Sequence, residues 1–364
     1  MTVVIRDGLI TDVGDALDIP RGSRIIDGAN KFLIPGLWDM HVHLAALAPI
    51  PRAPEVLVSY GVTGVRDMGG IQDDLRRLQT EIETGSRIGP RMLMAGNTLN
   101  GAAPADFHSI VASDKDVRRT LDELVEWGAD FVKIHRQLDP EIFHFLAEET
   151  RRRGLSLVGH VPQGVGLLEA SNAGMLSFEH AEAWLEAELY RRNQPAGSLA
   201  AALARLSGEP GRELFRAIAA NGTRITPTLS AYRAFIDAQE TAEQREMGER
   251  LYARLAAVTV EAQRAGVTIL AGTDFRSAPG KTLHDELVLL RDAGLSDGAA
   301  LRAATVDAAE ILGLDAGVVA VGTEASLVLL SANPLEDIAN VSNVTAVVLG
   351  GQYLSYEDVL ELRR

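Results

Sequence analysis

The sequence has no cysteine among its 364 residues, which excludes disulfide bonds and thiolate metal ligands. It also lacks a run of 18 apolar residues, and its start lacks a basic segment followed by an apolar core. We therefore expect no membrane span and no secretory signal, and a cytoplasmic location. The formal net charge of −15 disfavours nucleic acid as a partner, because phosphate binding requires a basic surface. The remaining expectation is a large enzyme with a small-molecule substrate, with a homo-oligomer as an open option.

The most informative stretch is Trp38-Asp39-Met40-His41-Val42-His43, which follows an apolar run. Side chains at i and i+2 of a strand project to the same face, so His41 and His43 would point the same way. At the end of a strand, this spacing lets both imidazoles bind one metal ion. A single His-x-His pattern also fits ordinary surface or hydrogen-bonded histidines. Further candidate ligands are needed to favour a metal site.

Four later apolar runs supply such candidates at or near their ends. They are residues 130–135 with Lys133 and His135, residues 156–160 with His160, residues 176–180 with His180, and residues 268–274 with Asp274. Amphipathic segments lie between the runs, for example residues 139–153 and 253–265. Strands that alternate with helical segments of about 10–15 residues indicate βαβ units and a parallel sheet.

Counting these runs predicts a closed architecture. The eight expected strands are residues 36–43, 62–68, 91–96, 130–135, 156–161, 177–181, 224–229 and 268–274. Eight strands with intervening helices fit a (β/α)8 TIM barrel, in which the carboxyl ends of the strands meet at one mouth. An open doubly wound sheet is the alternative, but it would not bring the first and eighth strands together.

The two ends of the chain have a different pattern. Val3-Val4-Ile5 and Arg24-Ile25-Ile26 are short β-rich pieces, and residues 326–330 and 346–349 repeat the pattern near the C-terminus. We expect residues 1–33 and 318–364 to pair into a small β-sandwich domain. Residues 34–317 would then form the barrel.

Several motifs together resemble the amidohydrolase superfamily, in its imidazolonepropionase and prolidase-like branch. They are Pro35-Gly36-Leu37-Trp38-Asp39-Met40-His41-Val42-His43, Gly61-Val62-Thr63-Gly64-Val65-Arg66-Asp67, Val158-Gly159-His160-Val161-Pro162, Phe178-Glu179-His180, Ala271-Gly272-Thr273-Asp274 and Asn333-Pro334-Leu335. The similarity extends from about residue 3 to 355. Each motif is short, and their combination carries the resemblance.

The resemblance implies a distorted TIM barrel with two divalent metal ions, zinc being the expected metal. His41, His43 and Asp274 would hold one ion, and His160 with His180 the other. Lys133 would bridge both ions as a carboxylated lysine, because a free ammonium has no lone pair to donate to a metal. Hydroxide between the ions would attack the substrate carbonyl, with Asp274 as the proton shuttle. The catalytic residues would be Asp274 and Lys133.

Each residue also has a simpler interpretation. Lys133 alone would more often be a salt-bridged lysine, Asp274 could cap a helix, and His160 or His180 alone would be a core histidine. Four residues are weaker candidates for substrate binding: His135, Tyr232, His284 and His108. Tyr232 could donate a hydrogen bond to an oxyanion, although packing is equally consistent. We expect Arg66 and Asp67 to form a supporting ion pair.

The leading function is hydrolysis of an amide or peptide-like C–N bond, in a dipeptide, an N-acyl amino acid or a cyclic amide. The same metal centre could instead act on an ester, lactone or phosphoester. A mononuclear deaminase would not need Lys133 as a bridge. A noncatalytic scaffold protein would have no reason to retain the full set of ligands.

Overall fold

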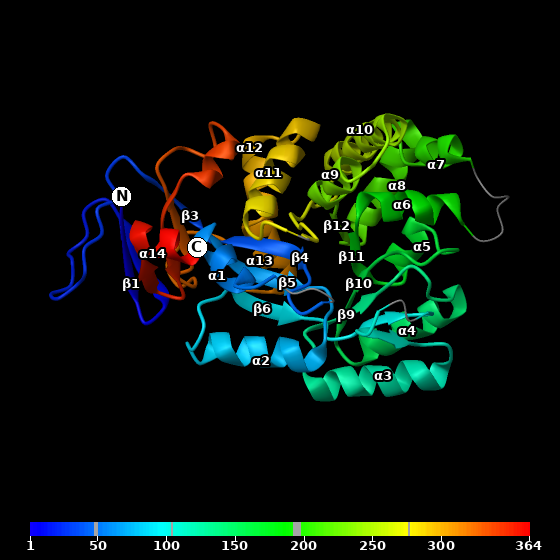
Figure 1. Ribbon diagram of the computed structural model, residues 1–364, viewed down its shortest axis with the longest axis horizontal. Helices are drawn as coiled ribbons and strands as arrows, with labels where there is room; N and C mark the ends of the chain where they lie inside the picture. Colours follow the sequence, from blue (N-terminus) through cyan, green and yellow to red (C-terminus); the bar gives the residue numbers. More distant parts are fainter. Residues whose placement is uncertain (47–49, 103–104, 192–197, 276) are drawn as a thin grey trace.

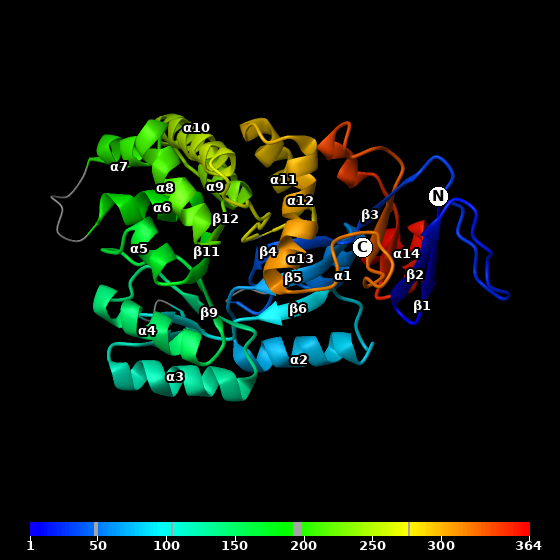
Figure 2. The ribbon, with the colours of Figure 1, turned by 180° about the vertical axis from the view of Figure 1, so that it is seen from behind.

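The computed structural model describes residues 1–46, 50–102, 105–191, 198–275 and 277–364. The chain has a mixed α/β fold, with parallel strands surrounded by helices in its larger part (Figures 1 and 2). Antiparallel strands and both termini lie together at one end of the molecule (Figure 1). None of the helices in the described ranges is long and apolar enough to cross a membrane.

Two groups of parallel strands form the centre of the larger part. One group has the order β4-β5-β6, and the other has the order β12-β11-β10-β9-β7-β8. Their bounds are β4 Leu37–Val42, β5 Val62–Asp67, β6 Arg91–Met94, β7 Thr98–Asn100, β8 His108–Ile110, β9 Phe131–Ile134, β10 Ser156–Gly159, β11 Met175–Glu179 and β12 Arg224–Thr226. Every residue of β4, β5 and β9 is buried, as expected for parallel strands covered on both faces.

Backbone hydrogen bonds connect the two groups at both sides. The amide of Asp130, just before β9, donates to the carbonyl of Met94 in β6 at 2.9 Å. On the other side, Ile225 of β12 forms an isolated parallel bridge with Ile269. The amide of Met40 in β4 then donates to the carbonyl of Ala271 at 2.9 Å. The segment around residues 269–271 therefore lies between β12 and β4.

The expected strand at residues 268–274 is only this single bridge and not a regular strand. The carboxylate of Asp39 accepts hydrogen bonds from both the amide and the hydroxyl of Thr273, at 3.0 and 2.7 Å. The next residue, Asp274, has a φ of 46°. The segment keeps backbone hydrogen bonds to β12 and β4, including the amide of Asp274 to the carbonyl of His41 at 2.7 Å, and the bonds of Thr273 to Asp39 add to them. The other seven expected strands are present, although most are shorter than predicted.

Helices cover the parallel strands. Their bounds are α1 Ala53–Ser59, α2 Gln72–Glu83, α3 Asp114–Trp127, α4 Pro140–Arg152, α5 Leu167–Asn172, α6 Ala181–Leu189, α7 Leu199–Arg205, α8 Gly208–Ala220, α9 Leu229–Asp237, α10 Ala242–Arg264, α11 Lys281–Ala293, α12 Asp297–Ala303 and α13 Val306–Leu312. Helix α4 begins as the sequence predicts, because the carboxylate of Asp139 accepts the amide of Glu141 at 2.8 Å. Helix α10 extends eleven residues further toward the N-terminus than the 253–265 segment predicted.

The antiparallel part combines both ends of the chain. Strand β1 (Thr2–Arg6) pairs with β2 (Leu9–Gly14), and a four-stranded sheet has the order β15-β14-β13-β3. The other bounds are β3 Phe32–Pro35, β13 Leu327–Leu330, β14 Val344–Leu349, β15 Gln352–Leu354, the 3-10 helix η1 Ile338–Ser342 and α14 Tyr356–Leu362. The strand expected at Arg24-Ile25-Ile26 is wrong: this segment is irregular, and Ile25 is 72% exposed.

Candidate metal centre

Candidate ligands come from the carboxyl ends of five segments around the parallel strands. His41 lies in β4 and His43 directly follows it, while Lys133 lies in β9. His160 is the first residue after β10, and His180 is the first residue after β11. Strands that run parallel present these ends at the same side, so residues far apart in sequence meet there.

The histidine rings form a continuous row across this side. Successive ring centroids are 5.4 Å apart for His43 and His41, 4.4 Å for His41 and His180, and 4.6 Å for His180 and His160. The row continues to His135 at 4.3 Å and to His108 at 5.4 Å. Six of the eight histidines of the chain thus lie in one row.

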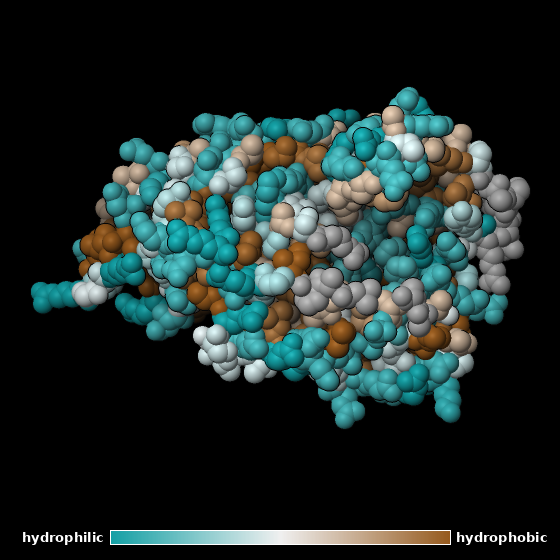
Figure 3. Space-filling model, in the orientation of Figure 1, coloured by the Kyte–Doolittle hydropathy of each residue, from teal (hydrophilic) through white to brown (hydrophobic). Residues whose placement is uncertain are grey.

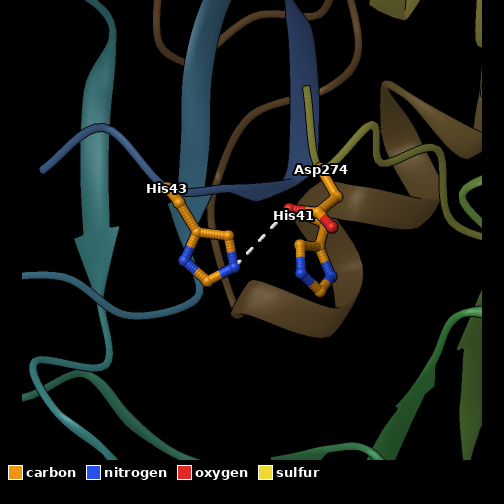
Figure 4. A group of neighbouring side chains, drawn as sticks. All are labelled: His41, His43 and Asp274. Carbon is orange, nitrogen blue, oxygen red and sulfur yellow. Dashed lines mark ion pairs between the residues drawn. The ribbon is translucent and has the colours of Figure 1, made fainter. Parts of the chain in front are cut away.

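His41, His43 and Asp274 form the tightest group. One possible ligand atom from each lies within 4.8 Å of the others, close enough for all three to contact one ion (Figure 4). Nε2 of His43 is 3.7 Å from Oδ1 of Asp274. Nε2 of His41 is buried and has no hydrogen-bond partner within the described ranges. A lone pair buried without a partner is costly, and a metal ion would satisfy it.

Lys133 lies beside this row with its amine buried. The residue is 2% exposed, and its Nζ makes no hydrogen bond to any described residue. Burial lowers the pKa of the Lys133 amine from 10.5 to about 8, although the charges of Glu179 and Asp274 act in the opposite direction. An uncompensated buried amine is unusual in a folded protein. It fits a side chain that receives a further group.

Gly159 makes room for Lys133. Its φ is +131°, and an added Cβ would lie 2.3 Å from the carbonyl oxygen of Ile134 and 3.0 Å from Cδ of Lys133. A larger residue at the end of β10 would therefore push against both the backbone of β9 and the lysine chain.

Burial favours the uncharged form of four histidines of the row, His41, His135, His160 and His180. It lowers the pKa of His180 to about 4 and holds the pKa values of His41 and His160 well below the ordinary value. Burial and the charge of Lys133 lower the pKa of His135 to about 3. Neutral imidazoles are the form that binds metals, so the row is ready to bind at neutral pH.

Glu179 holds His41 in place and was missed as a functional residue at the sequence level. Its Oε2 accepts a hydrogen bond from Nδ1 of His41 at 2.9 Å, which leaves Nε2 of that ring for a ligand. Its Oε1 accepts from Nη2 of Arg66 at 2.7 Å and from the hydroxyl of Ser177 at 2.6 Å. The expected ion pair of Arg66 with Asp67 is therefore wrong, because Arg66 pairs with Glu179 instead.

His43 and His180 are each held through their Nδ1 atom. Nδ1 of His43 donates to the carbonyl of Gly69 at 2.6 Å, and the amide of Gly69 donates to the carboxylate of Asp67 at 3.1 Å. Nδ1 of His180 is 2.8 Å from the hydroxyl of Thr228. The three supports direct the Nε2 atoms of His41, His43 and His180 away from these partners.

Three residues at this centre have strained backbones. The φ angles of His180, Thr228 and Asp274 are 61°, 50° and 46°, in the left-handed region that non-glycine residues rarely adopt. Threonine is particularly disfavoured there because it is β-branched. Such strain persists only where surrounding contacts fix the conformation, and it concentrates at functional sites.

The weaker candidates fall into two groups. His135 and His108 belong to the row, and each has a buried Nδ1 without a hydrogen-bond partner among the described residues. Tyr232 lies on α9, where burial and the charge of Glu182 raise the pKa of its hydroxyl. His284 lies on α11, and its Nε2 donates to the carbonyl of Tyr60 at 2.8 Å. Tyr60 precedes β5, so this contact is at the amino end of that strand, opposite to Asp67. Substrate contact by these four residues stays a prediction.

A cleft of about 620 Å³ is lined by residues that include Gly101, Val111, Arg136, Gln137, Asp139 and Gln163. Arg136 directly follows His135 in the sequence, and the described lining contains no histidine of the row. On the face drawn in Figure 3, the surface is hollowed and mainly hydrophilic in the region of β10 and β11. A polar substrate could reach the centre from this side.

Comparison with known proteins identifies the family. The sequence matches the amidohydrolase family over residues 32–354. The chain belongs to this family. Ochratoxinase from Aspergillus niger is 25% identical over 404 aligned residues, which cover 92% of this chain and 78% of ochratoxinase. The resemblance predicted from the sequence motifs is therefore confirmed.

Solved structures agree with this membership. Bottromycin amidohydrolase aligns with a TM-score of 0.76 and 25% sequence identity. The alignment covers 99% of this chain and 84% of the bottromycin amidohydrolase chain. A Xaa-Pro dipeptidase with bound methionine has a TM-score of 0.77 and 22% identity, and covers 97% of this chain and 94% of its own, a likeness of fold. The protein described here is thus a hydrolase of carbon–nitrogen bonds and belongs to a metal-dependent family.

Proposed function

We propose that this amidohydrolase uses two divalent metal ions, with zinc as the expected metal, to hydrolyse an amide or peptide-like C–N bond in a small molecule. The observation that carries the proposal is a pair of buried atoms, Nζ of Lys133 and Nε2 of His41, that have no hydrogen-bond partner among the described residues and lie at the histidine row. Both atoms need a further group to satisfy them, and a metal ion at His41 and a carboxylate group on Lys133 would do so.

The donor set fits two ions. We assign His41, His43 and Asp274 to one ion, which their mutual distances support. His160 and His180, with ring centroids 4.6 Å apart, are assigned to the other. Carboxylation of Lys133 would convert a cation into an anion with two oxygens, and a single such group can serve both ions. A mononuclear deaminase would leave the buried amine of Lys133 without a role.

The chemistry divides between the metals and the chain. When bound, the ions supply a nucleophilic water near neutral pH and polarise the scissile carbonyl. Asp274 accepts the proton of the attacking water and passes it to the leaving nitrogen, a role for a carboxylate at the site of attack. Glu179 holds His41 with its proton on Nδ1, and the hydroxyl of Thr228 holds the ring of His180 through Nδ1. His135, His108 and Tyr232 are assigned to substrate binding. His284 is predicted for the same role, although its Nε2 bonds the carbonyl of Tyr60 at the amino end of β5.

We infer the substrate class from the same relatives. Bottromycin amidohydrolase and the Xaa-Pro dipeptidase are named for reactions at amide or peptide bonds, and ochratoxinase is named for a reaction of ochratoxin. We therefore propose a dipeptide, an N-acyl amino acid or a cyclic amide as the substrate. An ester, lactone or phosphoester remains the alternative for the same centre, because the residues lining the cleft select the electrophile.

We also infer that the parallel strands close into a distorted (β/α)8 TIM barrel. The hydrogen bonds from Asp130 to Met94 and from Met40 to Ala271 support closure on both sides. The pairing of β3 with β13 supports a small β-sandwich domain made by residues 1–33 and 318–364, beside a barrel of residues 34–317. Homo-oligomerisation and a cytoplasmic location stay predictions.

A substrate screen with a matched pair of variants tests this function. Zinc-loaded protein is assayed against dipeptides, N-acyl amino acids, cyclic amides, lactones and phosphotriesters. Lys133→Ala should lose activity and regain part of it with short carboxylic acids, which can replace the carbamate. Lys115→Ala, at an exposed lysine of α3, is the control and should behave as the wild type. Wild-type turnover by Lys133→Ala, or hydrolysis of esters with no hydrolysis of amides, would contradict the proposal.

A further inference from the structure

Helix α9 begins without the usual cap. Its N-cap residue is Thr228, and a threonine at this position ordinarily accepts a backbone N–H of its own helix through its hydroxyl. Within the described ranges, Thr228 makes no such bond, and its φ and ψ are both 50°. A β-branched residue in the left-handed region is strained, so something must compensate for both the conformation and the missing cap.

The hydroxyl of Thr228 is directed to His180 instead. Its Oγ1 lies 2.8 Å from Nδ1 of that imidazole. The amide of His180 also donates to the carbonyl of Thr226 at 2.9 Å, so the end of β12 holds both the backbone and the ring of His180. The position of Thr228 therefore determines where Nε2 of His180 points.

Glu286 supplies the cap that Thr228 does not. It lies on α11 and is 0% exposed. Its Oε1 accepts the amide of Leu229 at 3.0 Å, and its Oε2 accepts the amide of Ser230 at 2.6 Å. A carboxylate buried this completely requires such hydrogen bonds, and the first amides of a helix are suitable donors. Both carboxylate oxygens of Glu286 therefore accept hydrogen bonds from the first turn of α9.

We propose that Glu286 is a positioning residue for His180, acting through Thr228. By capping α9 in place of the threonine, the carboxylate holds the left-handed turn and leaves the threonine hydroxyl for the imidazole. With the hydroxyl oxygen of Thr228 as the acceptor, His180 has its proton on Nδ1 and its lone pair on Nε2. The inference rests on the proposed metal centre, because the arrangement orients Nε2 of His180, which is proposed to bind a metal ion.

The contacts of Glu286 also affect Tyr232, a second predicted residue of the site. The amide of Tyr232 donates to the carbonyl of Thr228 at 3.4 Å, one turn into α9. Glu286 therefore fixes the start of the helix that carries Tyr232 as well as the ring of His180. A change at Glu286 should disturb metal binding and substrate binding together.

Zinc titration in competition with a chelating dye, on the full chain, tests the proposal. Glu286→Gln keeps the size of the side chain but replaces one acceptor by a donor that faces a backbone N–H. Thr228→Val removes only the hydroxyl, and Thr228→Ser restores it. We expect the first two variants to weaken one of the two zinc sites by about 10–100-fold, and Thr228→Ser to bind as the wild type. The double variant should be no weaker than Thr228→Val, because both changes break one connection.

A readout without metal separates positioning from stability. In zinc-free protein labelled with nitrogen-15 histidine, His180 of the wild type should have its proton on Nδ1, and this preference should fall in both variants. Glu188→Gln is the control: Glu188 is also buried and accepts the amide of Leu167 at 3.2 Å, away from the row. This control should lower the melting temperature without changing zinc affinity or the tautomer of His180.

The outcomes are distinct. Wild-type zinc affinity and an unchanged His180 tautomer in Glu286→Gln and Thr228→Val, with only the melting temperature lowered, would overturn the positioning role. If Glu286→Gln changed the zinc affinity or the His180 tautomer and Thr228→Val changed neither, the connection through the threonine would be overturned. If the wild type binds no zinc, the metal centre itself fails, while the tautomer measurement still reports on the support.

Discussion

Replacement of Glu179 by glutamine tests how the first metal site is held. The carboxylate is fully buried between Nδ1 of His41 and the guanidinium of Arg66, which is 1% exposed. Glutamine keeps the shape but loses the charge and turns one acceptor into a donor. If its nitrogen faces Arg66, two donors oppose each other. If it faces His41, the ring must move its proton to Nε2 and can no longer bind a metal through that atom.

The magnitude follows from burial. Removing one partner of a buried ion pair costs about 3–5 kcal/mol, because the remaining charge is left uncompensated. Total stabilities of proteins are about 5–15 kcal/mol, so the variant should unfold at a clearly lower urea concentration. Loss of the hydrogen bond to His41 should also weaken zinc binding by about 10–100-fold.

Urea unfolding in the presence of a chelator measures the first effect, and zinc titration measures the second. Glu209→Gln is the control, since Glu209 forms an exposed pair with Arg212 at 2.6 Å and its removal should change neither measurement. A Glu179→Gln protein that unfolds at the wild-type urea concentration and binds zinc as tightly as the wild type would refute the reasoning.

Three further predictions follow from the same contacts. Gly272→Ala would place a Cβ 2.6 Å from the side chain of Thr226 and 2.9 Å from the backbone amide of His41. Calorimetry should therefore show a loss of about 1–3 kcal/mol in the free energy of unfolding, and zinc titration should show weaker binding at the site of His41, His43 and Asp274. Wild-type stability and zinc affinity would contradict this packing. Burial raises the pKa of Glu286 from 4.5 to about 7, so unfolding releases a proton from this group between these values, and in metal-free protein the contribution of Glu286 to stability should fall by up to about 3 kcal/mol as the pH rises through this range. Glu286→Gln should lack this pH dependence, and equal slopes in the two proteins would contradict it. Saturating zinc should raise the melting temperature of the wild type, by mass action on the folded state; Lys133→Ala should show a smaller increase, and an equal one would contradict the bridging role.

Much of the centre could be predicted because its logic is local. His41 and His43 share a strand face through the two-residue period, and residues at the ends of parallel strands meet at one side. The family resemblance then assigned roles to Lys133, His160 and His180. Each of these inferences needed only short motifs and the order of the strands.

The supporting residues could not be found in this way, because their partners are distant in sequence. Glu179 lies 138 residues from His41, and Glu286 lies 57 residues from Leu229. One signal was available for Glu179: it is a charged residue in an apolar strand, two positions after Ser177, and such a charge must be paired. Glu286, inside an amphipathic helix, offered no comparable signal.

Misjudged segments have equally specific causes. Arg24-Ile25-Ile26 has β-forming residues, but strand propensity acts only where a partner strand and a packing surface are present, and Ile25 is exposed. Residues 268–274 are apolar like a strand and bond through their backbone to β12 and β4, but they form one isolated bridge and end at the left-handed Asp274. In both segments, contacts with the rest of the fold determined the backbone conformation more strongly than local strand propensity did.

The most direct test of the two-metal centre is an anomalous-difference map at the zinc absorption edge, from crystals of zinc-loaded protein. The account predicts two peaks, one within about 2 Å of His41, His43 and Asp274 and one at the same distance from His160 and His180. It also predicts electron density that extends from Nζ of Lys133 toward both peaks. A single peak, or two peaks with an unmodified Lys133 amine turned away from them, would contradict it.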